Sequence, residues 1–216
     1  MHRFRLYFVH SVLLCGPIFR GRSLKWSIVV AATMVIAGCG LFEPRDPEEP
    51  ISVRSTFTPP TEPQTVLDNM GASLRELNSV NYLRCLSDTG TGGLFQFEPT
   101  LAAAGVYGVF ATWDRSSEEA WFLNARSRLP SGSGMTVTFS TPVAQGVQPD
   151  SVTLDVPYDL SIPHGQQGIP QRVVGRSLLT MVLDRRTGTW SIRRWQDVAL
   201  SSIQATWSDA KGGLSQ

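Results

Sequence analysis

Hydrophobic positions in the second half of the chain recur every second residue, as in strands with one buried face. One alternation occupies residues 135–140, a longer one runs over 152–162, and 172–183 is strongly apolar. Turn residues fill 184–188, and 190–200 resumes the apolar pattern. Alternation interrupted by turn residues is typical of antiparallel strands. The pattern therefore predicts four strands, with a hairpin between the last two.

The aromatic residues of the last predicted strand depart from strict alternation. Trp190 and Ile192 fall on one face, whereas Trp195 falls on the other. One extra residue at Arg193–Arg194 would bring all three side chains to a common face. We therefore expect a β-bulge there, which would bend the strand and curve the sheet.

The first half of the chain has helical spacing instead. Apolar residues repeat every three or four positions from Val66 to Leu77, after a proline-containing capping box at 61–64. A short second helix is expected after Asn78 or Ser79, and a third from a capping box at 116–119 to Leu129. The glycine-rich residues 87–93 lack the pattern of a phosphate-binding loop and are expected to be an ordinary loop. Residues 95–97 are expected to form a brief strand, and 101–113 fit either helix or strand.

The beginning of the chain looks like a secretory signal. Lys25 precedes twelve mainly apolar residues, 26–37, which are too few for the roughly 20 residues of a membrane-spanning helix. Residues 1–23 add a second basic and apolar stretch, so translation starting at Leu24 is an alternative. We expect residues 1–38 to be removed on export.

A cysteine follows directly. Ile36-Ala37-Gly38-Cys39 resembles the lipobox of bacterial lipoproteins, in which the cysteine is acylated and becomes the new N-terminus. This resemblance implies a lipid anchor at Cys39, and several acyl chains hold a protein lastingly at a membrane. Gly40 stands where aspartate would signal retention in the inner membrane. The expected location is therefore the cell envelope, at the outer membrane in an organism that has one.

Composition separates a tether from a folded body. Prolines are dense from 43 to 63, so residues 39–62 are expected to be an extended, lipidated spacer. The folded domain is then expected over 63–208, with a flexible tail at 209–216. Residues 1–38 carry a charge of +5 and residues 39–216 a charge of −4, which argues against nucleic-acid binding by the exported part.

The order of these elements resembles the nuclear transport factor 2-like superfamily, also called cystatin-like cone folds, which includes ketosteroid isomerase and scytalone dehydratase. The resemblance rests on the helix pair at 63–86, the hairpin at 184–188 and the closing strand Trp-x-Ile-x-x-Trp-x-Asp at 190–197. It implies an α+β fold, with N-terminal helices in the concave face of a curved, mainly antiparallel sheet of four to five strands. Such motifs describe topology and leave the activity open.

Two residues are weak candidates for catalysis. Asp88 ends the second helix, near where acids line the cone in catalytic members of the superfamily, and a general base there would need a pKa raised by burial. A capping role for Asp88 is the simpler interpretation. His164, the one histidine after the leader, lies in a stretch between two prolines that we expect to be an exposed loop. Asp114, Glu118 and Glu119 are expected to belong to the start of a helix.

Other residue groups are candidate binding sites. Arg172 and Arg176 fall on one strand face, and Arg194 can join them as an anion-binding stripe or as a solvated surface. Trp113, Trp121, Trp190, Trp195 and Trp207 are many for a domain of this size, so the cone is expected to be filled or capped by aromatic rings. Cys85 is expected to be a buried thiol. No cluster of residues predicts a metal or another cofactor.

The favoured hypothesis is a non-catalytic, lipid-anchored envelope protein that binds a small apolar ligand or a protein partner, or serves as a structural subunit. The alternative is an enzyme resembling ketosteroid isomerase or the dehydratases, with Asp88 as base. The enzyme needs an open cavity with an inward acid, whereas a structural subunit needs a packed cone and an exposed apolar patch. The sequence indicates no oligomeric state.

Overall fold

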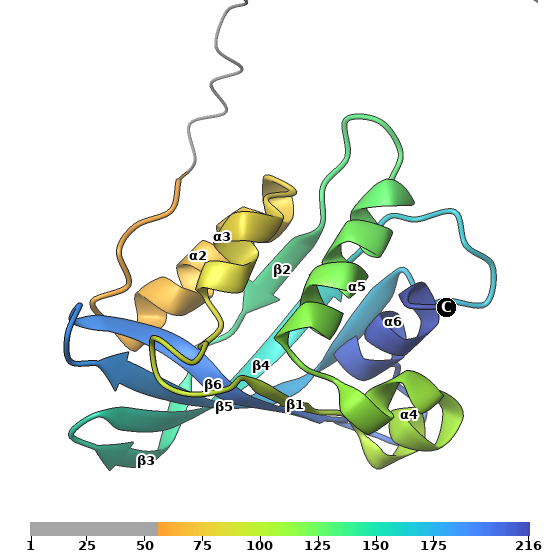
Figure 1. The fold of residues 1–216 in the computed structure, drawn as a ribbon. Coiled ribbons are helices and arrows are strands. Elements are labelled where there is room, and N and C mark those ends of the chain that lie inside the picture. Colours follow the sequence, from red (N-terminus) through yellow and green to blue (C-terminus); the bar gives the residue numbers. More distant parts are fainter. Residues whose placement is uncertain (1–55) are drawn as a thin grey trace, which may run out of the picture. The chain divides into compact units, whose positions relative to one another are not determined.

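A curved, mostly antiparallel sheet of six strands carries helices on its concave face (Figure 1). The computed structural model describes residues 56–216. The expected signal sequence, the start at Leu24, the Cys39 lipid site and most of the tether therefore lie outside the described residues. The strands are β1 (Gln96–Glu98), β2 (Thr136–Phe139), β3 (Val143–Gln148), β4 (Ser151–Ser161), β5 (Arg172–Asp184) and β6 (Thr189–Val198).

The strand order is β1-β6-β5-β4-β2, and β3 also pairs with β4. All pairs are antiparallel except β1 with β6. The expected α+β class with a curved sheet is thus confirmed. The sheet has six strands rather than four or five, because β1 adds a short parallel edge and β3 adds an exposed hairpin partner to β4.

Four helices, α2, α3, α5 and α6, lie over the concave face (Figure 1). The helical segments are α2 (Pro63–Arg75), α3 (Ser79–Arg84), α4 (Leu101–Val106), the 3-10 helix η1 (Gly108–Thr112), α5 (Arg115–Ser127) and α6 (Trp207–Leu214). Apolar faces explain the packing of the longer ones: Val66, Leu67, Met70 and Leu74 of α2 are all buried in the core. Within residues 56–216, no helix is long and apolar enough to span a membrane.

The predicted β-bulge in the last strand is confirmed. Thr180 pairs with Arg194 and Met181 pairs with Ile192, so Arg193 is the extra residue of β6. The insertion lets Ile192 and Trp195 both point into the core, where they are 0% and 1% exposed.

The helix starts were predicted in part. Asn78 caps α3 by accepting a hydrogen bond from the backbone N–H of Asn81 (3.1 Å). The box expected at 116–119 is wrong, because Asp114 caps α5 and forms its box with Ser117. Helix α2 begins at Pro63 without a side-chain cap.

The flexible tail expected at 209–216 is also wrong. Helix α6 spans Trp207–Leu214 and is buried along most of its length. Its glycines, which lower helix propensity, are required by packing: a Cβ at Gly212 would lie 2.3 Å from the ring of Tyr107. Glycine at this position lowers the helix propensity of α6, but it allows α6 to pack closely against the segment after α4.

Candidate functional site

The centre of the cone is filled by a charged side chain from α6. Lys211 is fully buried and forms an ion pair with Glu118 of α5, which is also fully buried. Its ammonium nitrogen lies 3.6 Å from the ring centroid of Phe97 and 3.9 Å from that of Trp195. Three further tryptophan rings, those of Trp113, Trp121 and Trp207, have centroids 5.7–5.9 Å away. We call these rings, with Glu118, the lysine cage.

The carboxylate of Glu118 has three donors. It accepts hydrogen bonds from Lys211, from the Tyr82 hydroxyl (2.8 Å) and from Nε1 of Trp113 (2.7 Å). Burial lowers the pKa of Lys211 to about 8, although the charge of Glu118 opposes the shift. Burial, followed by the charge of Glu118, raises the pKa of Tyr82. The Glu118 carboxylate therefore already has its donors inside the protein, whereas Nε1 of Trp121 and Nε1 of Trp207 in the cage are buried without a hydrogen-bond partner among the described residues.

A second buried carboxylate fixes the start of the same helix. Asp197 of β6 accepts from the hydroxyl of Tyr158 (2.7 Å) and from both the backbone N–H (2.7 Å) and the hydroxyl (2.6 Å) of Ser208. The Tyr158 hydroxyl in turn accepts from the backbone N–H of Trp207 (2.7 Å). These bonds hold α6 against the sheet.

The interior consequently offers little space for a substrate. Trp121, Trp195 and Trp207 are among the largest fully buried side chains, and Trp113 is only 8% exposed. The sequence predicts that aromatic rings either fill or cap the cone, and the structure shows that they fill it. Cys85 is the buried thiol that the sequence predicts, and burial raises its pKa to about 12.

Lys211 is not among the residues that the sequence singles out, and Glu118 is expected from the sequence only at a helix start. One signal was available: Lys211 is the only lysine after Lys25, and it follows Trp207 by four residues, one helical turn. Its partner Glu118, however, is 93 residues away in the chain, so no local pattern links the two.

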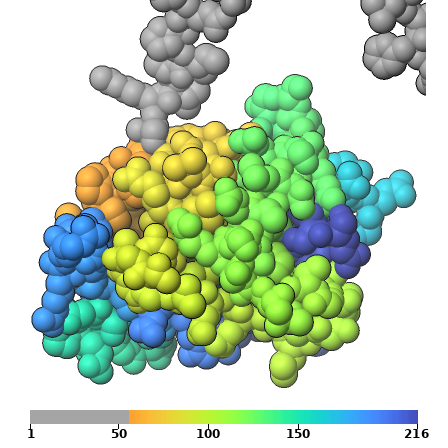
Figure 2. Space-filling model, in the orientation of Figure 1, coloured from red at the N-terminus to blue at the C-terminus, as the bar shows by residue number. Residues whose placement is uncertain are grey.

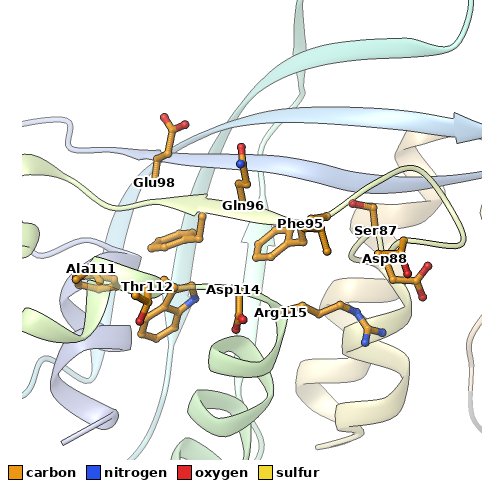
Figure 3. A pocket seen from close by; sticks show the side chains of 14 residues that line it. Ser87, Asp88, Phe95, Gln96, Glu98, Ala111, Thr112, Asp114 and Arg115 are labelled. Atoms are coloured by element: carbon orange, nitrogen blue, oxygen red, sulfur yellow. The ribbon is translucent and has the colours of Figure 1, made fainter.

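An accessible hollow lies beside the cage, between β1 and the segment from η1 to the start of α5. This β1–η1 groove has a volume of about 700 Å³. Aromatic rings line it: Phe97, Phe110 and Trp113 lie 4.9–5.9 Å apart by ring centroids. Figure 3 shows Phe95 on the α5 side of β1, with Gln96 and Glu98 on the opposite side. Figure 2 shows the segments from α3 to α5, in yellow to green, covering this side of the domain.

The rim of the β1–η1 groove carries more negative than positive charge. Asp88, Glu98, Asp114 and Arg115 all line it. Glu98 is paired with Arg194 (2.6 Å), which comes from the neighbouring strand. Hydrogen bonds from Ser116 and Ser117 lower the pKa of Asp114. Arg115 donates to the backbone carbonyl of Leu83 (3.0 Å). An anionic ligand would therefore meet repulsion at this rim.

Asp88 reaches the groove but lacks the environment of a general base. Its carboxylate accepts hydrogen bonds from the Thr91 hydroxyl (2.9 Å) and the Gly90 N–H (2.9 Å). These bonds lower its pKa, which is opposite to the raised pKa that proton abstraction near neutral pH requires. Through these two hydrogen bonds Asp88 stabilises the turn of the glycine-rich loop, which is a structural role.

His164 is not exposed, which corrects the sequence-based expectation. It is 1% exposed, its Nδ1 accepts from the backbone N–H of Gln166 (3.2 Å), and its Nε2 lies 3.3 Å from the carbonyl oxygen of Pro170. Because Nδ1 accepts, Nε2 carries the proton and donates to Pro170. The ring therefore stabilises its own loop.

The three candidate arginines each face a carboxylate. Arg172 pairs with Asp159, Arg176 with Asp155 and Arg194 with Glu98. In each pair, two guanidinium nitrogens already donate to the carboxylate, which leaves fewer donors for an anion. Anion binding by these arginines is untested and stays a prediction. Among residues 56–216, no three His, Cys, Asp or Glu side chains are grouped to hold a metal.

No family model matches the chain, and no curated protein does. Solved structures resemble the fold. An NTF2-like protein from Cytophaga hutchinsonii is 12% identical with a TM-score of 0.44, covering 63% of this chain and 94% of that one. A cystatin-like fold protein of unknown function from Nostoc punctiforme is 13% identical with a TM-score of 0.43 (64% and 89% covered). A ketosteroid isomerase-like protein from Erwinia carotovora atroseptica is 8% identical with a TM-score of 0.42 (64% and 93% covered). These values carry no activity over to this chain.

Proposed function

We propose that this chain is a lipid-anchored protein of the cell envelope whose domain binds an apolar ligand without catalysis, in the β1–η1 groove. The observation that carries this proposal is the contrast between a filled interior and an adjoining groove of about 700 Å³ with aromatic walls. That volume falls in the usual range for small-molecule sites, which are mostly apolar. The charged rim favours a ligand without negative charge.

A catalytic role has less support. The cavity that a cone enzyme would use is occupied by Lys211, and Asp88 has a lowered pKa. Glu118 and Asp197 are engaged by buried donors. The buried hydrogen bonds of Glu118 and Asp197 give both side chains a role in stabilising the fold.

Binding in the groove is tested with phenylnaphthylamine, an uncharged apolar dye that fluoresces when it leaves water. Ala111 is exposed and lines the groove, so Ala111→Asp would place a charge beside the bound dye and weaken binding by about tenfold, or about 1.4 kcal/mol. Val80→Asp makes the same change at an exposed position of α3 that does not line the groove, and should leave binding unchanged. Equal affinities for both variants, or no binding by the parent, would reject this site.

The anchor is tested separately with Cys39→Ser. The variant should stay unprocessed and unacylated, and cell fractionation with mass spectrometry would detect both effects. A serine variant that is processed and recovered with membranes like the parent would contradict acylation at residue 39.

A further inference from the structure

One end of the domain exposes aliphatic side chains on two uncharged segments, and Asp209 lines the surface hollow beside them. Leu101 and Val106 of α4 are 94% and 71% exposed, and Leu200 and Ile203 before α6 are 55% and 93% exposed. Residues 99–113 and 199–208 contain no Asp, Glu, Lys, Arg or His. We call Leu101, Val106, Leu200 and Ile203 the aliphatic end.

The two segments lie side by side. Ala102 of α4 and Ile203 line the same surface hollow, and the backbone N–H of Thr100 donates to the Ser208 hydroxyl (3.1 Å). Figure 2 shows the region around α4 as a corner of the domain. Four exposed, large aliphatic side chains on two adjoining segments mark a candidate interaction surface.

The composition of this surface fits a lipid bilayer better than a protein. Protein interfaces draw most of their binding energy from Trp, Tyr and Arg, and they need shape complementarity. The aliphatic end offers protruding Leu, Val and Ile side chains, which a fluid acyl region can accept without a matching shape.

The length of chain before the domain also supports a lipid bilayer as the partner of the aliphatic end. Seventeen residues, 40–56, separate Cys39 from Phe57, and an extended chain of that length reaches about 50 Å. A domain of this size is about 40 Å across. A lipid at Cys39 would therefore let the aliphatic end touch the membrane that holds the anchor. The tether would also raise the effective membrane concentration, so weak insertion suffices.

We propose that the aliphatic end inserts into the interfacial region of the bilayer to which the chain is anchored, an inference that rests on the lipid anchor of the proposed function. Contact is driven by apolar burial alone, because no basic side chain belongs to this surface and the exported chain is negatively charged overall. Docking is therefore insensitive to salt.

The test supplies the anchor chemically, so that it does not depend on natural acylation. The chain starting at Cys39 is coupled through that thiol to a maleimide lipid in phosphatidylcholine vesicles; Cys85 is buried and does not compete. Hydrogen exchange of the backbone is then followed by mass spectrometry with and without coupling. We expect exchange in 101–106 and 199–206 to slow by at least about tenfold on coupling, equally at low and high salt.

Two variants complete the test. Leu101→Asp with Ile203→Asp should abolish this protection, whereas Val147→Asp, at a 75% exposed position of β3, should leave it intact. Unchanged exchange at the aliphatic end of the coupled parent would overturn the proposal. Protection that appears only after envelope proteins are added, without lipid, would overturn it in favour of a protein partner. If Cys39→Ser left the natural location unchanged, that result would contradict acylation at residue 39 but would not bear on the vesicle experiment, in which the lipid is coupled chemically.

Discussion

The lysine cage and the β1–η1 groove share two aromatic residues, Phe97 and Trp113, but use them in opposite ways. On the inner side, Phe97 lies against the ammonium of Lys211 and Trp113 donates to Glu118. On the outer side, the same residues line an accessible hollow with Phe110. An aromatic lining thus becomes core where the chain supplies its own cation, and a candidate binding surface where it does not.

Replacing Lys211, the cation of the lysine cage, should have the largest effect on stability of the changes considered. Lys211→Met leaves Glu118 buried without its counter-charge, so the free energy of unfolding should fall by about 3–5 kcal/mol, measured by urea denaturation. The double variant Lys211→Met/Glu118→Gln should be more stable than the sum of the single effects predicts, by about 1 kcal/mol or more. Additive losses would mean that the two side chains do not act as a pair.

The packing that brings α6 to the cage is tested by Gly212→Ala. The new methyl group would lie 2.3 Å from the Tyr107 ring, so we expect a loss of about 1–3 kcal/mol in thermal or urea unfolding. Gly105→Ala in α4 is the matched control, because nothing lies within 4 Å of its added Cβ and alanine favours helix. Equal stabilities of the two variants would refute the tight approach.

The pH dependence of stability sharpens the electrostatic half of the comparison. The pKa of Lys211 is lowered to about 8 in the folded chain from its ordinary 10.5. Between these values the unfolded chain binds more protons, so the free energy of unfolding should rise by about 1 kcal/mol from pH 8 to 9. Above pH 9 the raised pKa of Cys85 acts in the opposite direction. A parent curve with the same slope as that of Lys211→Met would contradict the shift.

Much of this fold could be predicted from local patterns. The spacing of Val66 to Leu74 indicated α2, and the displaced Trp195 indicated the bulge, because burial of one face imposes a fixed period. Helix α6 was missed because Gly212 and Gly213 are poor helix formers, and only the contact with Tyr107 explains Gly212. The parallel pairing of β1 with β6 likewise joins segments almost a hundred residues apart.

The candidate sites were less predictable than the fold. Asp88 was expected near acids that line the cone, whereas it lines the outer β1–η1 groove, and its pKa direction depends on Gly90 and Thr91 in a turn that the sequence does not specify. His164 was expected in solvent because its neighbours are prolines and glycines, but its ring is enclosed by its own loop. Partners of buried polar groups come from distant segments, so their roles require the tertiary structure.

The most direct measurement is nuclear Overhauser contacts between phenylnaphthylamine and the methyl groups of the chain from residue 40 onward. The account predicts contacts to Leu94 and Ala111, which line the groove, with none to Met135 or Leu214, which are fully buried. Contacts to Met135 or Leu214, with the side-chain signal of Lys211 displaced on binding, would show that the interior opens to ligands and would contradict the closed cage.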